Sequence, residues 1–137
     1  MQTPRPSVLA CVTSQYDCDR IIEAAKQFAE EEDLELRVLS VLRPTTNYAL
    51  ISDQLEYLHL VSKKAGADMT VIFSDNAPKA AADFATESEA ARIVTGMHDG
   101  GKESFLVMFN RLAPTVSISM VDKDRNIYSM DVRCHAR

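Results

Sequence analysis

The segment with the strongest chemical character is a glycine-rich loop, residues 95–104, which reads TGMHDGGKES. Its glycines, Gly96, Gly100 and Gly101, allow unusual backbone angles and the close approach of a ligand. Lys102 adds a positive charge, and free backbone amides at the start of a following helix face an anion. A strand, this loop and a helix in that order favour a phosphate cradle, and an ordinary strand-to-helix turn is the alternative that the residues leave open.

The loop is close to two catalytic motifs and satisfies neither of them. Gly96-x4-Gly101-Lys102 follows the P-loop pattern until Glu103, which stands where a Ser or Thr would hold Mg²⁺ and which repels phosphate. DGGKES is similar to the SGGxDS loop of ATP pyrophosphatases, but that loop follows the first strand, and here the first strand ends in VTSQ. We therefore expect no enzymatic activity, no catalytic residue and no metal ligand.

Other reactive side chains give weaker signals. Cys11, Cys18 and Cys134 follow no paired spacing, which argues against a disulfide framework and a zinc site and is typical of reduced thiols in a cytosol. His98 with Asp99 could act as an acid–base pair, but a solvated loop pair is the simpler interpretation. Catalytic sets of the Cys-His or Ser-His-Asp kind need a fold to bring them together.

Short apolar stretches of strand length alternate with amphipathic stretches of helix length along the chain. Strands are expected at residues 7–13, 34–42, 69–73, 91–95 and 115–121. Ser14 or Asp17 is the expected N-cap of the first helix, Asn76 with Pro78 opens the third, and the fourth runs over residues 103–112. The alternation predicts right-handed crossovers and a mostly parallel sheet. Residues 127–132 alternate and offer a sixth strand, antiparallel to the fifth.

Length and composition fit one globular domain, residues 1–137, with a core at 7–121 and a tail at 122–137. The chain has 137 residues, a hydrophobic fraction of 46% and a net charge of −5. Nucleic-acid binding needs a concentrated basic surface, and no such stripe is visible, so we expect neither nucleic-acid nor membrane-surface partners. The N-terminus has no apolar signal region, and we expect a soluble cytoplasmic protein.

Several segments together resemble the universal stress protein superfamily. VLACVTSQYDCDRIIEAAKQFA is similar to the first strand and helix of these proteins, LRVLSVLRP to their second strand, and FNRLAPTVSISMV to their last helix and fifth strand. ADMTVIFSDNAPKAAADFATESEAARIVTG is similar to the region between their third and fourth strands. Within the superfamily, CVTS and SFLVMFNRLAP most resemble the stress-protein-like domain of the potassium-responsive sensor kinase KdpD.

The resemblance implies a three-layer α/β/α sandwich, Rossmann-like and of the adenine nucleotide alpha hydrolase type. Its five parallel strands take the order 3-2-1-4-5, and ligands bind where the order reverses, between strands 1 and 4. The fifth strand is then a sheet edge that lacks blocking charges or prolines, and we expect a homodimer through it. Residues 127–132 could instead fold back over the same edge.

The resemblance also implies where a nucleotide binds. ATP-binding members use an Asp at the end of the first strand and a G-x2-G-x9-G-[ST] loop. Here Thr13 replaces that Asp, the loop is shortened, and Glu103 replaces its last Gly. The positions carried over are Thr13, Val41 through its backbone, Gly96, Gly100, Gly101, Lys102 and Ser104.

The function predicted is a nucleotide-binding or signalling module, regulatory rather than catalytic, with a degenerate ATP-binding loop. Its ligand would be ATP or another adenine nucleotide, with no cofactor required, and a signalling protein is a further expected partner. The similarity to KdpD raises cyclic di-AMP, although neither an SxS after the first strand nor an FTAxY segment is present. One alternative is a ligand-free dimeric interaction module, and another is an NTPase or adenylating enzyme.

Overall fold

The sheet contains six strands in the order β3-β2-β1-β4-β5-β6. The computed structural model describes residues 6–97 and 104–130. The strands are β1 (Ser7–Val12), β2 (Glu35–Leu42), β3 (Met69–Phe73), β4 (Ala90–Gly96), β5 (Ser117–Val121) and β6 (Ile127–Met130). β1 to β5 are parallel, and β6 runs antiparallel to β5. The predicted strand order and the optional sixth strand are both confirmed.

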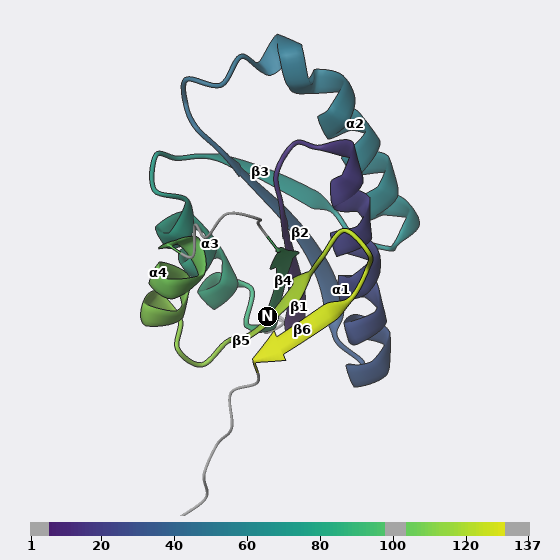
Figure 1. Ribbon diagram of the computed structural model, residues 1–137, viewed down its shortest axis with the longest axis vertical. Coiled ribbons are helices and arrows are strands. Elements are labelled where there is room, and N and C mark those ends of the chain that lie inside the picture. Colours follow the sequence, from purple (N-terminus) through teal and green to yellow (C-terminus); the bar gives the residue numbers. More distant parts are fainter. Residues whose placement is uncertain (1–5, 98–103, 131–137) are drawn as a thin grey trace, which may run out of the picture.

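The helices form two layers, one on each face of the sheet. They are α1 (Asp19–Glu32), α2 (Tyr48–Lys64), α3 (Ala77–Glu87) and α4 (Ser104–Leu112). Figure 1 shows α1 and α2 on one side of the sheet and α3 and α4 on the other. This arrangement follows from right-handed crossovers, because the chain runs outward from β1 to β3 and then returns to β4 on the opposite face.

β1 is the centre of the molecule, and all six of its residues are buried. Alternate side chains serve the two layers, since Val8, Ala10 and Val12 pack in the cluster under α1 while Leu9 and Cys11 pack in the cluster under α3 and α4. A strand buried on both faces needs apolar residues at every position, which explains the uninterrupted run VLACV.

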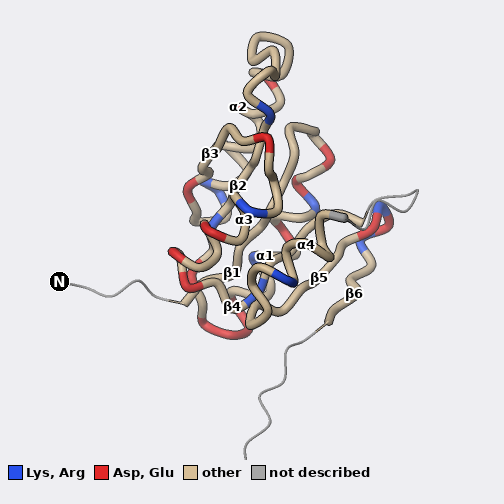
Figure 2. Tube along the Cα trace, turned by 90° about the vertical axis from the view of Figure 1, so that its left-hand side faces the viewer, with Lys and Arg blue, Asp and Glu red and all other residues tan. Residues whose placement is uncertain are grey.

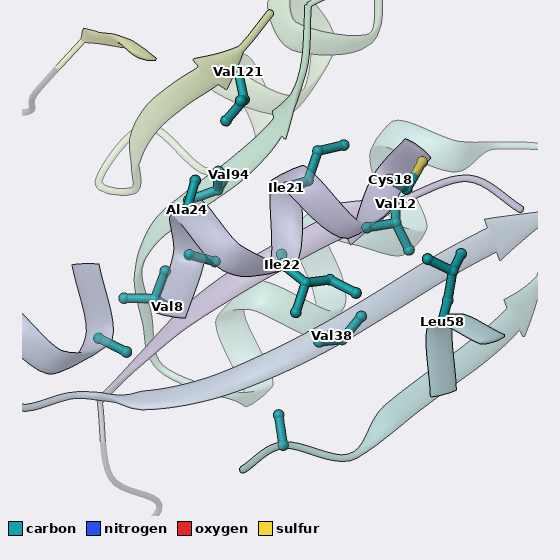
Figure 3. Packing of buried hydrophobic residues seen from close by; sticks show 14 residues of the cluster. Val8, Val12, Cys18, Ile21, Ile22, Ala24, Val38, Leu58, Val94 and Val121 are labelled. Carbon is teal, nitrogen blue, oxygen red and sulfur yellow. The ribbon is translucent and has the colours of Figure 1, made fainter. Parts of the chain in front are cut away.

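α1 covers the sheet through a stripe of small and branched side chains. Figure 3 shows Ile21, Ile22 and Ala24 of α1 lying among Val8 and Val38 of the strands beneath. Ile22 is fully buried, and burial of such a side chain contributes about 1.5–3 kcal/mol. This packing fixes the first turn of α1 against the carboxyl ends of β1 and β4.

The predicted N-cap of the first helix is wrong. A short 3₁₀ turn, η1 (Tyr16–Cys18), precedes α1, and Cys18 occupies the N-cap position without a side-chain cap bond. The backbone is already in the right-handed helical region at Cys18, so the chain enters α1 directly and neither Ser14 nor Asp17 caps it. The Asp17 carboxylate instead pairs with Arg20.

The predicted start of the third helix is confirmed. The Asn76 side chain accepts a hydrogen bond from the backbone amide of Lys79 at 3.3 Å, and Pro78 lies in the first turn of α3. α2 ends in Lys63 and Lys64 and is followed by Gly66 at φ +85°, the left-handed conformation that favours glycine. Asn76 and Pro78 therefore begin α3 as the sequence predicts, and Gly66 allows the chain to turn after α2.

The sequence left two arrangements open for the edge at the fifth strand, and the structure has the second, in which the chain folds back and covers that strand. β6 pairs with β5 along its length, from Ile118 opposite Met130 to Val121 opposite Ile127. β5 also begins later than expected, because the Val116 amide bonds to the carbonyl of Ala113 in a turn after α4. Among the described strands, the edges are β3 and β6.

Candidate functional site

A pocket of about 280 Å³ lies at the carboxyl ends of β1 and β4. It is lined by the end of β1, by η1 and the first turn of α1, by the end of β4, and by Lys123 of the turn between β5 and β6. The strand order reverses between β1 and β4, so the connections after these strands leave on opposite faces and a crevice opens between them. The topology thus places a pocket at the position where the resemblance predicts a ligand.

Two of the predicted site residues meet in this pocket. Thr13 follows β1 and Gly96 ends β4, and both line the pocket although they are far apart in sequence. Val41 does not line it, and its side chain packs against the buried cluster under α3 and α4. Ser104 is the first residue of α4. Gly100, Gly101 and Lys102 lie outside the described residues.

The Thr13 side chain occupies the position where the ribose-binding Asp was expected. Its Oγ1 lies 3.3 Å from the Cys18 Sγ, and its carbonyl accepts a hydrogen bond from the Ser40 Oγ at 3.5 Å. Thr13 itself remains exposed. A neutral hydroxyl in this place provides one weak polar contact to a ligand and no negative charge.

Arg20 lines the pocket and was missed by sequence reasoning, as was Lys123. It is only 9% exposed, although arginine is rarely buried unless it is paired. Its Nε donates to the Asp122 carbonyl at 3.0 Å and its Nη1 to the Asp17 carbonyl at 2.8 Å. The Asp122 carbonyl is 102 residues away along the chain, so only the position of the turn after β5 reveals this contact.

Gly96 lies directly against Arg20. A Cβ atom on Gly96 would lie 3.3 Å from the Arg20 Nη2 and 3.2 Å from the Ile21 Cδ1. Both distances are tighter than ordinary van der Waals contacts. Gly96 therefore leaves space beside the Arg20 guanidinium that a larger residue would fill.

The turn between β5 and β6 is held by Asp122. Its Oδ1 accepts from the backbone amides of Asp124 at 2.9 Å and Asn126 at 2.8 Å, and its Oδ2 accepts from the Asn126 Nδ2 at 3.1 Å. The hydrogen bond from the Asn126 amide is the largest of the effects that lower the pKa of Asp122. The turn places Lys123 at the pocket and the Asp122 carbonyl at Arg20.

Two free cysteines, Cys11 and Cys18, also line the pocket. Burial raises the pKa of Cys11 to about 12, with a smaller contribution from nearby Cys18. A thiol with so high a pKa is protonated at neutral pH and is a poor nucleophile. Cys11 is therefore a packing residue at the base of the pocket.

A larger hollow of about 650 Å³ lies at the opposite end of the sheet, beside the amino ends of β2 and β3. It is lined by four carboxylates and two cations: Glu30, Asp33, Glu35, Asp68, Lys26 and Arg37. This charge balance disfavours a phosphate ligand, and ligands of open α/β sheets bind at the carboxyl ends of the strands. We therefore take the smaller pocket as the candidate site.

Charges are dispersed over the molecule. Figure 2 shows Lys and Arg scattered among Asp and Glu along the described trace. Within residues 6–97 and 104–130, no helix is both long and apolar enough to cross a bilayer. The two cations that line the pocket, Arg20 and Lys123, are therefore a local feature of a chain whose net charge is −5.

The sequence is similar to part of a sensor kinase. No family model matches the chain. It is 28% identical over 92 residues to the sensor protein KdpD of two Mycobacterium tuberculosis strains, a match that covers 67% of this chain. The chain spans about a tenth of the length of these curated relatives, since the match covers 11% of them.

The structure is similar to solved universal stress proteins. One is from Archaeoglobus fulgidus in complex with dAMP, with a TM-score of 0.64 and 19% identity, and the match covers 88% of this chain and 98% of that one. A universal stress protein in complex with cAMP gives the same values. Identity this low establishes the fold alone. The chain has the universal stress protein fold, and the predicted resemblance is confirmed at that level.

Proposed function

We propose that this chain is a regulatory nucleotide-binding module that holds a small adenine nucleotide in the pocket between β1 and β4. The observation that carries the proposal is the meeting of Thr13 and Gly96, from two separate strands, in one pocket at the strand-order reversal. The complexes of two structural neighbours with dAMP and cAMP support an adenine ligand. The similarity to KdpD supports a role in signalling with a protein partner in the cytoplasm.

The size of the pocket favours a mononucleotide. Its volume of about 280 Å³ lies just below the span of typical ligand sites, which is about 300–1,000 Å³. A cyclic dinucleotide needs considerably more space. The proposal is therefore a mononucleotide, with ATP as the largest candidate and cyclic di-AMP disfavoured.

We propose no catalytic step at this site. The sequence carries Glu103 where a P-loop carries the hydroxyl that holds Mg²⁺, and a carboxylate there opposes phosphate binding. Cys11, the thiol at the base of the pocket, is held protonated by burial. The ligand would act as a signal whose binding changes the surface that a partner reads.

Calorimetric titration with AMP, cAMP, ATP and cyclic di-AMP tests the proposal. We expect a mononucleotide to bind with one-to-one stoichiometry and more tightly than cyclic di-AMP, and we expect no ATP turnover with Mg²⁺. Absence of binding of all four compounds at millimolar concentration, with the protein folded by circular dichroism, would refute nucleotide binding.

A second candidate function is a ligand-free dimeric interaction module. The exposed edge strand β6 favours it, since Ile127, Tyr128 and Met130 are 40%, 47% and 55% exposed. The homodimer predicted from the sequence remains a proposal, and β6 rather than β5 is the strand through which it would now form. Sedimentation over a range of concentrations, with and without nucleotide, distinguishes this function from the first.

A further inference from the structure

The geometry points to Arg20, assisted by Lys123, as the group that binds the terminal phosphate of a nucleoside monophosphate in this pocket. This inference rests on the proposed function and deepens it, because it names the part of the ligand that is recognised. It assigns a specific side chain to a role that the sequence predicted for the backbone and Lys102 of the glycine loop.

The guanidinium of Arg20 is held in place by hydrogen bonds, but some of its N–H groups have no partner. Of its five N–H groups, the one on Nε bonds to the Asp122 carbonyl and one on Nη1 to the Asp17 carbonyl. The Asp17 Oδ2 lies 3.3 Å from Nη1. Within the described part of the chain, Nη2 has no hydrogen-bond partner, so two donors remain for a ligand.

Nη2 lies beside Gly96 in the wall of the pocket. It lies 3.3 Å from the point where a side chain on Gly96 would begin, and both Arg20 and Gly96 line the pocket. Nη2 is also not among the polar atoms that are fully buried without a partner. The two free donors therefore face the space that Gly96 leaves open.

The charges around Arg20 favour binding of an anion. The side chain of Arg20 is 10% exposed, and that of Asp17, its only carboxylate partner among the described residues, is 56% exposed. A largely buried cation is poorly compensated by a carboxylate that water screens. Lys123, on the turn after β5, adds a second cation to the lining, so Asp17, Arg20 and Lys123 together carry a charge of +1.

A terminal phosphate satisfies these groups better than a cyclic one. Guanidinium groups bind phosphate through paired N–H donors, and a phosphate monoester offers three unsubstituted oxygens and close to two negative charges at neutral pH. A cyclic phosphodiester has two such oxygens and one charge. The pocket therefore favours AMP over cAMP, and adenosine, which has no phosphate, should bind most weakly.

Asp17 opposes this binding, because its carboxylate competes for the same guanidinium. Removing its charge in Asp17→Asn should raise the affinity for a phosphate monoester. Removing the cations in Arg20→Gln or Lys123→Gln should lower it. Arg125→Gln is the matched control, since Arg125 lies on the same turn as Lys123, bonds to Glu23 and does not line the pocket.

The test is a calorimetric comparison of AMP, cAMP, adenosine and inorganic phosphate on the full chain and these four variants. We expect wild type to bind AMP about tenfold or more tightly than adenosine, the range for hydrogen bonds to a charged group. Arg20→Gln should remove this difference, Lys123→Gln should reduce it, Asp17→Asn should increase it, and Arg125→Gln should leave it unchanged. Circular dichroism checks that each variant folds. If Arg20→Gln does not fold, the affinities of the two variants at exposed residues, Lys123→Gln and Asp17→Asn, test the inference.

The outcomes separate this inference from the proposed function. Equal affinity for AMP and adenosine, or an AMP preference that persists in Arg20→Gln, overturns the role of Arg20 and leaves adenine-nucleotide binding in place. If no adenine compound binds but inorganic phosphate does so in an Arg20-dependent manner, the anion site stands and the proposed function fails. If neither binds, both are overturned.

Discussion

The sharpest test of the pocket is a pair of glycine-to-alanine substitutions that should cost similar stability but differ in their effect on binding. In Gly96→Ala the new methyl group enters the pocket wall, 3.2 Å from the Ile21 Cδ1 and 3.3 Å from the Arg20 Nη2. In Gly66→Ala the methyl group meets nothing within 4 Å, but the backbone there has φ +85°. One substitution therefore perturbs the pocket and the other perturbs only the backbone after α2.

The expected costs follow from these geometries. At Gly96, overpacking costs about 1–3 kcal/mol and alanine recovers about 0.5–1 kcal/mol of chain entropy. The neighbours yield little, because Ile21 is 3% exposed and Arg20 is held by two carbonyls. We expect a net loss of roughly 0.5–2 kcal/mol, and at Gly66 a left-handed alanine costs roughly 1–2 kcal/mol before a similar entropic gain.

These energies translate into comparable thermal shifts. With an unfolding entropy of about 2.1 cal/mol/K per residue over 137 residues, Tm should fall by roughly 2–7 °C in Gly96→Ala and by roughly 0–5 °C in Gly66→Ala. Affinity for AMP should fall about tenfold, or 1.4 kcal/mol, in Gly96→Ala alone. Calorimetry provides both quantities. Wild-type affinity in Gly96→Ala, or an equal loss in both variants, would refute the assignment of the pocket.

Three other predictions concern reactivity, pH and turnover. Burial raises the pKa of Cys11 to about 12, so a thiol-specific reagent should modify Cys11 only after denaturant is added, and peptide mass mapping locates the label. The backbone amide of Asn126 lowers the pKa of Asp122, so the stabilisation from Asp122 is complete above its unfolded value of 3.8 and is lost as pH falls through the folded value. Urea midpoints of wild type and Asp122→Asn should therefore differ at about pH 7 and converge well below pH 3.8. Incubation with ATP and Mg²⁺ should release no phosphate above background, and sustained turnover that disappears in Lys102→Ala would restore the P-loop interpretation.

Much of the fold could be predicted because its signals are local. The apolar run around Leu9 has the length of a strand and side chains for both faces, which identifies a central parallel strand. Asn76 and Gly66 mark helix ends through bonds and backbone angles that depend only on near neighbours. The site was predictable in part for the same reason, since Thr13 and Gly96 follow directly from the ends of two such strands.

The rest depended on contacts between distant parts of the chain. Nothing in the sequence around Arg20 marks it as buried, because its surroundings are created in part by the Asp122 carbonyl, which lies 102 residues away along the chain. The cap of α1 was mispredicted because the chain enters the helix through η1, whose geometry reflects packing of Cys18 in the core. Val41 was assigned through its backbone, and its side chain points into the layer under α3 and α4.

The strand β6 links the sheet edge to the pocket, and this link can be tested. β6 covers β5, and the turn that precedes it supplies both the Asp122 carbonyl that holds Arg20 and the Lys123 side chain at the pocket.

Deleting residues 127–137 should therefore have two effects. It bares β5 and should increase self-association measured by sedimentation, because an uncovered strand offers unpaired N–H and C=O groups. It also releases the turn and should weaken AMP binding, although residues 127–130 do not line the pocket. Measuring the affinity at concentrations where the truncated chain is monomeric separates the two effects. A truncated monomer that binds AMP as tightly as the full chain would show that Arg20 and Lys123 do not depend on β6.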